Sequence, residues 1–146
     1  MGLNDLNTGL LTLDRTTCME LLATEQLGRI VLVIGGRPEI FPVNYAVDGE
    51  GIVFRTERGT KLSGAAIAPV LFEVDHLDLD DGSAWSVIIR GRCNLVGEYE
   101  SPMLLGQISR QPRYPWAGAD KPYVLRVRPT SVTGRRIASR VAPARL

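Results

Sequence analysis

The residues best suited to binding chemistry lie in a seven-residue segment that carries three cations. It reads Arg55-Thr56-Glu57-Arg58-Gly59-Thr60-Lys61, and Arg58 and Lys61 flank the start of a small helix predicted over about 60–67. The positive end of a helix dipole disfavours cations at that place. A phosphate would make them favourable, because helix N–H groups and basic side chains bind an anion together. The segment therefore indicates an anion site, although a solvated charge cluster explains the spacing of the three cations as well.

Further candidate residues lie on apolar segments. Asn44 follows Pro42 in such a segment, where its amide needs partners or costs about 1–3 kcal/mol. A heterocycle or a neighbouring backbone group would supply them. Trp85 precedes Ser86 at the start of a long strand, where the indole either covers a flat ring or fills the core. The lone His76 is more typical of a loop residue than of a proton donor.

These candidates are placed by strands joined through tight turns. Thr17-Cys18-Met19-Glu20 fits a capping box, while Gly35-Gly36 and the segment 48–51 are hairpin signals. The patterns predict strands over 28–34, 38–47, 52–56, 70–75, 85–96 and 123–128, and short helices over 18–26, 60–67 and 102–110. Consecutive antiparallel strands of this kind favour a sandwich or a barrel.

Alternation predicts which side chains share a face of each strand. Phe41, Val43, Tyr45 and Val47 lie together on one face of the second predicted strand. Pro42, on the other face, lacks the N–H that a strand pairing needs, so it indicates an edge, a bulge or the approach of another molecule. In the fourth predicted strand, Val70, Phe72 and Val74 are expected to point inward.

The composition narrows the class of protein. The 146 residues are 45% hydrophobic and 23% charged with a net charge of +1, which argues against disorder and against a dedicated nucleic-acid binder. Cys18 and Cys93 suggest no disulfide framework, and one histidine supplies no zinc site. No secretory signal or membrane span is visible. We expect a cytoplasmic single domain over 1–146, with flexible ends at 1–13 and 138–146.

Taken in order, five segments resemble the pyridoxamine 5′-phosphate oxidase-like family, and more narrowly its flavin/deazaflavin-dependent oxidoreductase branch. They are Pro42-Val43-Asn44-Tyr45, Phe54-Arg55-Thr56 with Gly59-Thr60-Lys61, Phe72-Glu73-Val74-Asp75, Trp85-Ser86-Val87, and Arg90-Gly91-Arg92. The resemblance covers about residues 13–137. It implies a mainly β fold with short helices, a six-stranded antiparallel split β-barrel of the FMN-binding type. It also implies a homodimer with two flavin sites at the subunit interface.

The same resemblance implies roles for individual residues. Arg55 and Lys61 would hold the flavin phosphate, supported by Thr56 and Thr60. The ring edge would be lined by Pro42, Val43 and Asn44, and the same pocket by Trp85, Ser86 and Val87. Trp116 would close over the ring from the partner chain. The chain ends soon after Gly134-Arg135-Arg136, without the C-terminal substrate segment of the true oxidases, so we do not expect vitamin B6 oxidation.

The resulting hypothesis is hydride transfer between bound FMN and a small conjugated or heteroaromatic substrate. Three alternatives stay open. The pocket could take the 8-hydroxy-5-deazaflavin coenzyme, with Arg58, Arg90 and Arg92 extending a basic groove for its anionic tail. The protein could be a non-catalytic flavin carrier or sensor. It could also bind haem or another tetrapyrrole, for which His76 is the one histidine ligand in the sequence.

Overall fold

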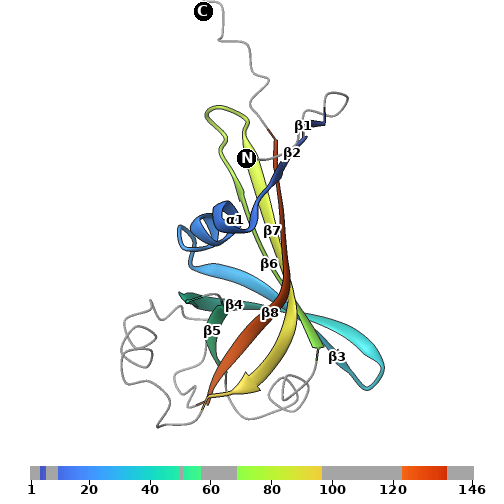
Figure 1. Cartoon of the computed structure of the whole chain (residues 1–146). Helices are drawn as coiled ribbons and strands as arrows, with labels where there is room; N and C mark the ends of the chain where they lie inside the picture. The colour runs from blue at the N-terminus through green and yellow to red at the C-terminus, as the bar shows by residue number, and fades with distance from the viewer. Residues whose placement is uncertain (1–3, 6–9, 50, 57–68, 97–122, 138–146) are drawn as a thin grey trace, which may run out of the picture.

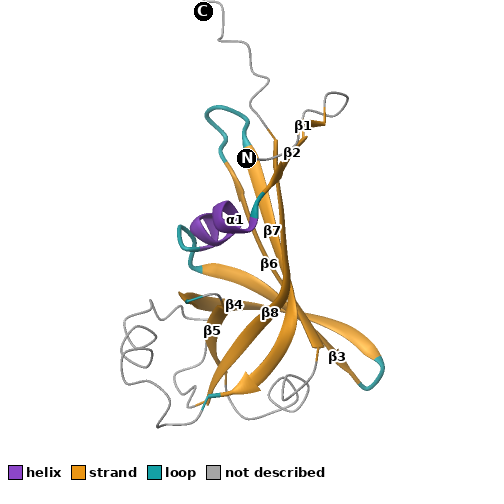
Figure 2. Cartoon of the chain, in the orientation of Figure 1, coloured by secondary structure: helices purple, strands orange, loops and turns teal. Residues whose placement is uncertain are grey.

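A computed structural model describes residues 4–5, 10–49, 51–56, 69–96 and 123–137. Strands dominate these residues (Figure 2). The elements are β1 (Asn4–Asp5), β2 (Leu10–Leu13), α1 (Arg15–Leu22), β3 (Leu27–Ile34), β4 (Arg37–Asp48), β5 (Gly51–Thr56), β6 (Pro69–Leu77), β7 (Ala84–Leu95) and β8 (Tyr123–Ile137). The helices predicted over 60–67 and 102–110 lie outside the described residues. Within those residues, no helix is long and apolar enough to cross a membrane.

The sheet closes on itself as a six-stranded antiparallel barrel. Its strand order is β8-β5-β4-β3-β6-β7, and β7 pairs back onto β8. Beyond the barrel, β6, β7 and β8 continue as an arm (Figure 1). There β2 pairs with the last four residues of β8, and β1 pairs with β2. The predicted six-stranded split barrel is confirmed.

The hairpins form where the glycines predict them. Gly35 and Gly36 adopt φ values of 58° and 78° between the paired residues Ile34 and Arg37. A two-residue hairpin turn needs positive φ at both positions, which glycine adopts at little cost. Gly49, with φ of 57°, lies in the turn from β4 to β5.

The barrel core consists of the side chains on the inner face of the strands. Val70, Phe72 and Val74 are buried there, as predicted, and so are Val43 and Tyr45. The Tyr45 ring meets the Phe72 ring edge-on, and its hydroxyl donates to the Leu22 carbonyl. Burial also raises the pKa of Tyr45. This hydrogen bond ties the end of α1 to the barrel.

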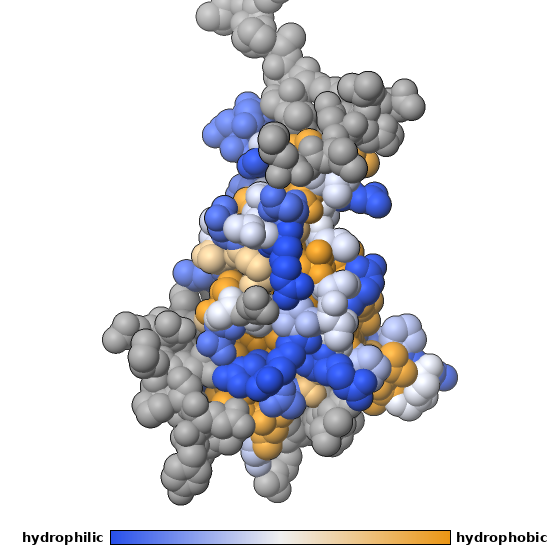
Figure 3. Space-filling model, viewed as in Figure 1, coloured by the Kyte–Doolittle hydropathy of each residue, from blue (hydrophilic) through white to orange (hydrophobic). Residues whose placement is uncertain are grey.

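The outer face of β3, β4 and β6 leaves aliphatic side chains exposed. Val33 and Ile40 are 61% and 60% exposed, and Leu27 and Leu71 point the same way. Figure 3 shows this apolar surface on the β3–β4 hairpin. The two faces of the sheet therefore differ in their environment: one packs the core and the other is open.

The start of α1 differs from the prediction. Asp14 is the N-cap rather than Thr17, and the helix spans Arg15–Leu22 rather than 18–26. The Thr17 N–H donates to Asp14 Oδ1 at 2.8 Å, and this bond holds the pKa of that carboxyl well below its usual range. The Asp14 carboxylate, three residues before Thr17, accepts a hydrogen bond from the Thr17 N–H. With Thr17 as the N-cap, as the capping box predicted, this N–H would have had no such partner.

The last strand is longer than predicted, continuing past Arg128 to Ile137. Pro129 is accommodated opposite Gly91, next to a register shift between Arg90 and Gly91 in the β7–β8 pairing. A bulge of this kind tolerates a proline that regular pairing would exclude. The extension also gives Leu10–Leu13, expected as a flexible lead-in, a strand to pair with.

We predict that Gly91→Ala destabilises the barrel at this bulge. A Cβ at Gly91 would lie 2.2 Å from the Arg128 carbonyl oxygen, so backbone must move. Strain of this kind costs about 1–3 kcal/mol in the free energy of unfolding, measurable by urea denaturation. Thr12→Ala, at an exposed position on β2, is the matched control. Equal stability of the two variants would contradict the prediction.

Candidate functional site

The sequence-predicted site residues that the structure describes lie on three strands of the barrel. Pro42, Val43 and Asn44 are on β4, Arg55 and Thr56 on β5, and Trp85, Ser86 and Val87 on β7. The remaining three, Thr60, Lys61 and Trp116, lie outside the described residues.

The pleat of the strands divides these residues between two faces. Four point inward and are buried: Val43, Thr56, Trp85 and Val87. The other four alternate with them and point to the outer face: Pro42, Asn44, Arg55 and Ser86. A ligand on the outer face therefore meets the side chains of the second group. From Val43, Thr56 and Val87 it meets only backbone groups.

Asn44 and Arg55 form the most informative pair on that face. Asn44 precedes Tyr45 and Arg55 follows Phe54. Because Tyr45 and Phe54 are paired on neighbouring antiparallel strands, the Asn44 and Arg55 side chains lie next to each other. Asn44 Oδ1 and Arg55 Nε are both buried, and neither has a hydrogen-bond partner among the described residues. Each such group costs about 1–3 kcal/mol. One missing ligand that supplies an N–H and an anionic oxygen would satisfy both.

Ser86 lies on the same outer face but farther around the barrel. Asn44 on β4 is paired with Leu27 on β3, β3 is paired with β6 through Arg29 and Glu73, and Asp75 on β6 is paired with Ser86 on β7. Three strand spacings, about 14 Å, separate β4 from β7. The structure thus brings Pro42, Asn44 and Arg55 together, and places Ser86 at the other end of the face.

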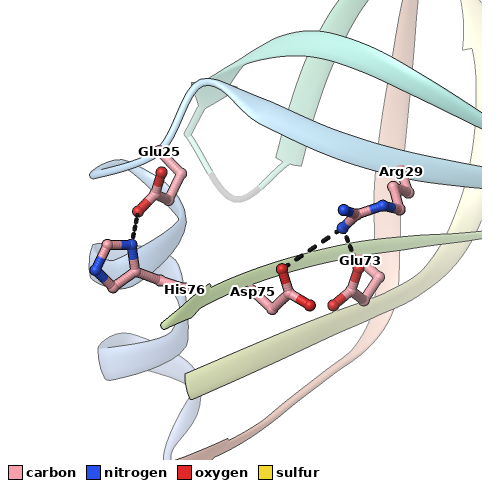
Figure 4. A network of polar contacts seen from close by, with 5 residues as sticks. All are labelled: Glu25, Arg29, Glu73, Asp75 and His76. Atoms are coloured by element: carbon pink, nitrogen blue, oxygen red, sulfur yellow. Dashed lines mark hydrogen bonds and ion pairs between the residues drawn. The ribbon is translucent and has the colours of Figure 1, made fainter. Parts of the chain in front are cut away.

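Between these two ends lies a charged cluster that the sequence reasoning missed (Figure 4). Arg29 Nη1 is 3.3 Å from a Glu73 carboxylate oxygen and 3.5 Å from one of Asp75. Burial raises the pKa of Glu73, as does the neighbouring Asp75 carboxylate, while Arg29 opposes the shift. A signal was available: Arg29 is the one charged residue in an otherwise apolar strand.

His76 is part of strand β6 rather than of a loop. Its Nδ1 lies 2.7 Å from Glu25 Oε1, and its ring stacks on Trp85 with 6.2 Å between centroids. In the neutral imidazole, a proton on Nδ1 donated to Glu25 leaves Nε2 as an acceptor. Glu25 follows α1 in a turn, and no pattern in the sequence pointed to this pair.

We predict that Asn44→Val raises the free energy of unfolding, or leaves it unchanged. The substitution removes a buried carbonyl oxygen that has no partner, worth about 1–2 kcal/mol. Urea denaturation measures the change, and Asn94→Val is the control, because the Asn94 amide is near solvent and donates to the Leu95 carbonyl. Destabilisation of the Asn44 variant beyond the control would show that the amide is already satisfied.

Glu73 should make stability depend on pH. Because its pKa is raised above the ordinary value of 4.5, the folded protein binds its proton more readily than the unfolded chain does. Its contribution is therefore fully present below that value and is lost as the pH rises through the folded pKa. We expect Glu73→Gln to lose less stability than the wild type as the pH rises above 4.5, whereas exposed Glu39→Gln should behave like the wild type. Parallel profiles for all three proteins would refute this.

Comparison with known proteins shows which family the chain belongs to. The family model described as pyridoxamine 5′-phosphate oxidase matches residues 14–136, which include β3 to β7 and β8 up to Arg136. The uncharacterized protein Rv0080 of Mycobacterium tuberculosis is 33% identical over 135 residues, covering 87% of this chain and 85% of that protein.

Two solved structures share the fold. The FAD binding protein from Mycobacterium smegmatis is 35% identical with a TM-score of 0.67, covering 87% of this chain and 97% of its own. A FAD-binding protein from Mesorhizobium loti is 22% identical with a TM-score of 0.74, covering 87% and 96%. The second likeness is one of fold alone. With the extent of the family match, these findings show that the chain belongs to the pyridoxamine 5′-phosphate oxidase family.

Proposed function

We propose that this chain is a flavin-dependent oxidoreductase that binds FMN on the outer face of β4 and β5, between two copies of itself. The observation that carries the proposal is the adjacent pair of buried groups without partners, Asn44 Oδ1 and Arg55 Nε. The flavin ring offers an N–H for the first, and the FMN phosphate offers an oxygen for the second. The 35% identical Mycobacterium smegmatis protein, which binds FAD, supports a flavin rather than an unrelated anion.

Pro42 favours the approach of a flat ring to β4. It lies on the part of β4 that pairs with β3 but precedes the residues paired with β5, which begin at Tyr45. Proline carries no N–H, so no donor is left unpaired at this edge. By the family resemblance, Thr60 and Lys61 would complete the phosphate site that Arg55 begins. Trp116 of the partner subunit would cover the ring.

The chain's residues on this face suit a redox cofactor that exchanges protons with its surroundings. When bound, the flavin would supply hydride transfer to or from a small conjugated or heteroaromatic substrate. The Arg29 guanidinium orients the carboxyls of Glu73 and Asp75 between Pro42 and Ser86. Since Glu73 keeps its proton to higher pH than an ordinary carboxyl, it can hold a proton beside the substrate.

A second copy of the chain would complete the site. The exposed Val33, Ile40 and Leu71 form an apolar surface on the same outer face as Asn44, and Leu27 lies on that face beyond Arg29. Contiguous apolar surface of this kind marks interaction sites. A two-fold dimer would cover it twice and make two equivalent cofactor sites. We therefore include the homodimer in the proposal.

We predict that Arg55→Gln weakens FMN binding about 10- to 100-fold. Losing a hydrogen bond between a guanidinium and a phosphate costs about 1.5–3 kcal/mol. Titration of the apoprotein with FMN, FAD and the deazaflavin coenzyme, followed by absorbance and fluorescence, gives the affinities. Lys61→Ala is expected to behave like Arg55→Gln. Arg37→Gln, at the exposed start of β4, should bind as the wild type does.

The same titration distinguishes the three coenzymes. The coenzyme that binds with the highest affinity is the one that the site prefers. Sedimentation of the flavin-loaded protein should show a dimer. A wild-type protein that binds none of the three coenzymes would refute the proposed function.

A further inference from the structure

A pocket of about 430 Å³ opens on the arm, where β2, β6, β7 and β8 lie side by side. Its wall is a row of aliphatic side chains, one from each strand, set by the register of the pairings: Leu10, Leu77, Ala84 and Ile137. Leu77 is 59% exposed although it faces this row. The volume and the apolar wall suit a small flat ring.

The next row of the same pocket is polar and has a free cation. It consists of Asp75, Ser86 and Arg135, which are paired across β6, β7 and β8. Asp75 already faces the Arg29 guanidinium at 3.5 Å. Arg135 forms no ion pair with any described residue, and the Ser86 hydroxyl forms no hydrogen bond with one. The polar end of the pocket is therefore matched to a negatively charged group.

The inner face of the sheet lies behind this pocket. Trp85 alternates along β7 with Ala84 and Ser86, so its side chain points to the inner face, where it is only 7% exposed and stacks on His76. His76 Nδ1 lies 2.7 Å from Glu25 Oε1. These contacts hold β6 and β7 in place, and a ligand in the pocket meets the side chains of the two outer rows.

We propose that this pocket binds a small planar carboxylate, an aromatic or heteroaromatic acid. Its carboxylate would lie on Arg135 and its ring against the aliphatic row. The pocket adjoins the Ser86 end of the outer face, so this acid would be the substrate of the flavin enzyme. That role rests on the proposed function. Binding of the acid itself does not, because every residue invoked here lies apart from Asn44 and Arg55.

The test compares acids with their neutral amides. The protein as purified is titrated by calorimetry with nicotinate and benzoate, and with nicotinamide and benzamide. We expect both acids to bind at least tenfold more tightly than their amides, since each amide has the same ring without the charge. Equal affinity for acid and amide, or no binding of either acid, would overturn the proposal.

Variants locate the site. Arg135→Gln should lower the affinity for the acids at least tenfold and leave the amides unchanged, as expected for loss of one charge-assisted contact. Arg136→Gln, the neighbouring arginine that does not line the pocket, should bind as the wild type does. Ala84→Phe should block acids and amides alike by filling the pocket. Unchanged acid binding in Arg135→Gln or in Ala84→Phe would overturn the assignment.

Flavin titration of the same variants separates the two proposals. FMN affinity that is unchanged in Arg135→Gln supports a site distinct from that of the cofactor. Loss of FMN binding in Arg135→Gln, without binding of the acids to the wild type, would show that the flavin occupies the pocket and would overturn the inference. Selective acid binding by a protein that takes no flavin would refute the proposed function and leave this inference standing.

Discussion

The pairing of β7 with β8 is the interaction on which the rest of the structure depends. It runs from Ala84–Ile137 to Leu95–Leu125 and closes six strands into a barrel. The same length of β8 pairs with β5 in its first part and with β2 in its last part. Without the bulge at Gly91, Pro129 would interrupt this strand. The pocket on the arm could then not form, because Arg135 and Ile137 lie beyond that point.

Closure of the barrel also determines which side chains face the core and which stand on the outer face. Because successive side chains point to opposite faces of a strand, the inner face packs the main core, and the outer face carries the candidate binding residues beside a smaller buried cluster of Val53, Val96 and Val124. Val43, Trp85 and Val87 contribute to the core, whereas Asn44, Arg55 and Ser86 stand on the outside.

The outer face keeps polar groups that folding alone does not satisfy. Asn44 Oδ1 and Arg55 Nε have no described partner, and Glu73 and Asp75 share one arginine. Such arrangements reduce stability, and natural proteins retain them mainly at functional sites. Their concentration on a face that also exposes aliphatic side chains is the physical basis for proposing that a cofactor and a second subunit meet there.

Local patterns determined much of this protein. The Gly35-Gly36 pair predicted the β3–β4 turn, and alternation predicted the buried faces of β4 and β6. The order of five short segments pointed to the family. The tertiary structure alone decided that β8 continues through Pro129, that Asp14 caps α1, and that Glu25 meets His76. It also decided that Ser86, Arg135 and Leu10 share a pocket. These outcomes depend on contacts between residues far apart in the chain, or on which of several competing polar groups reaches a free N–H, and neither leaves a periodic signal in the sequence.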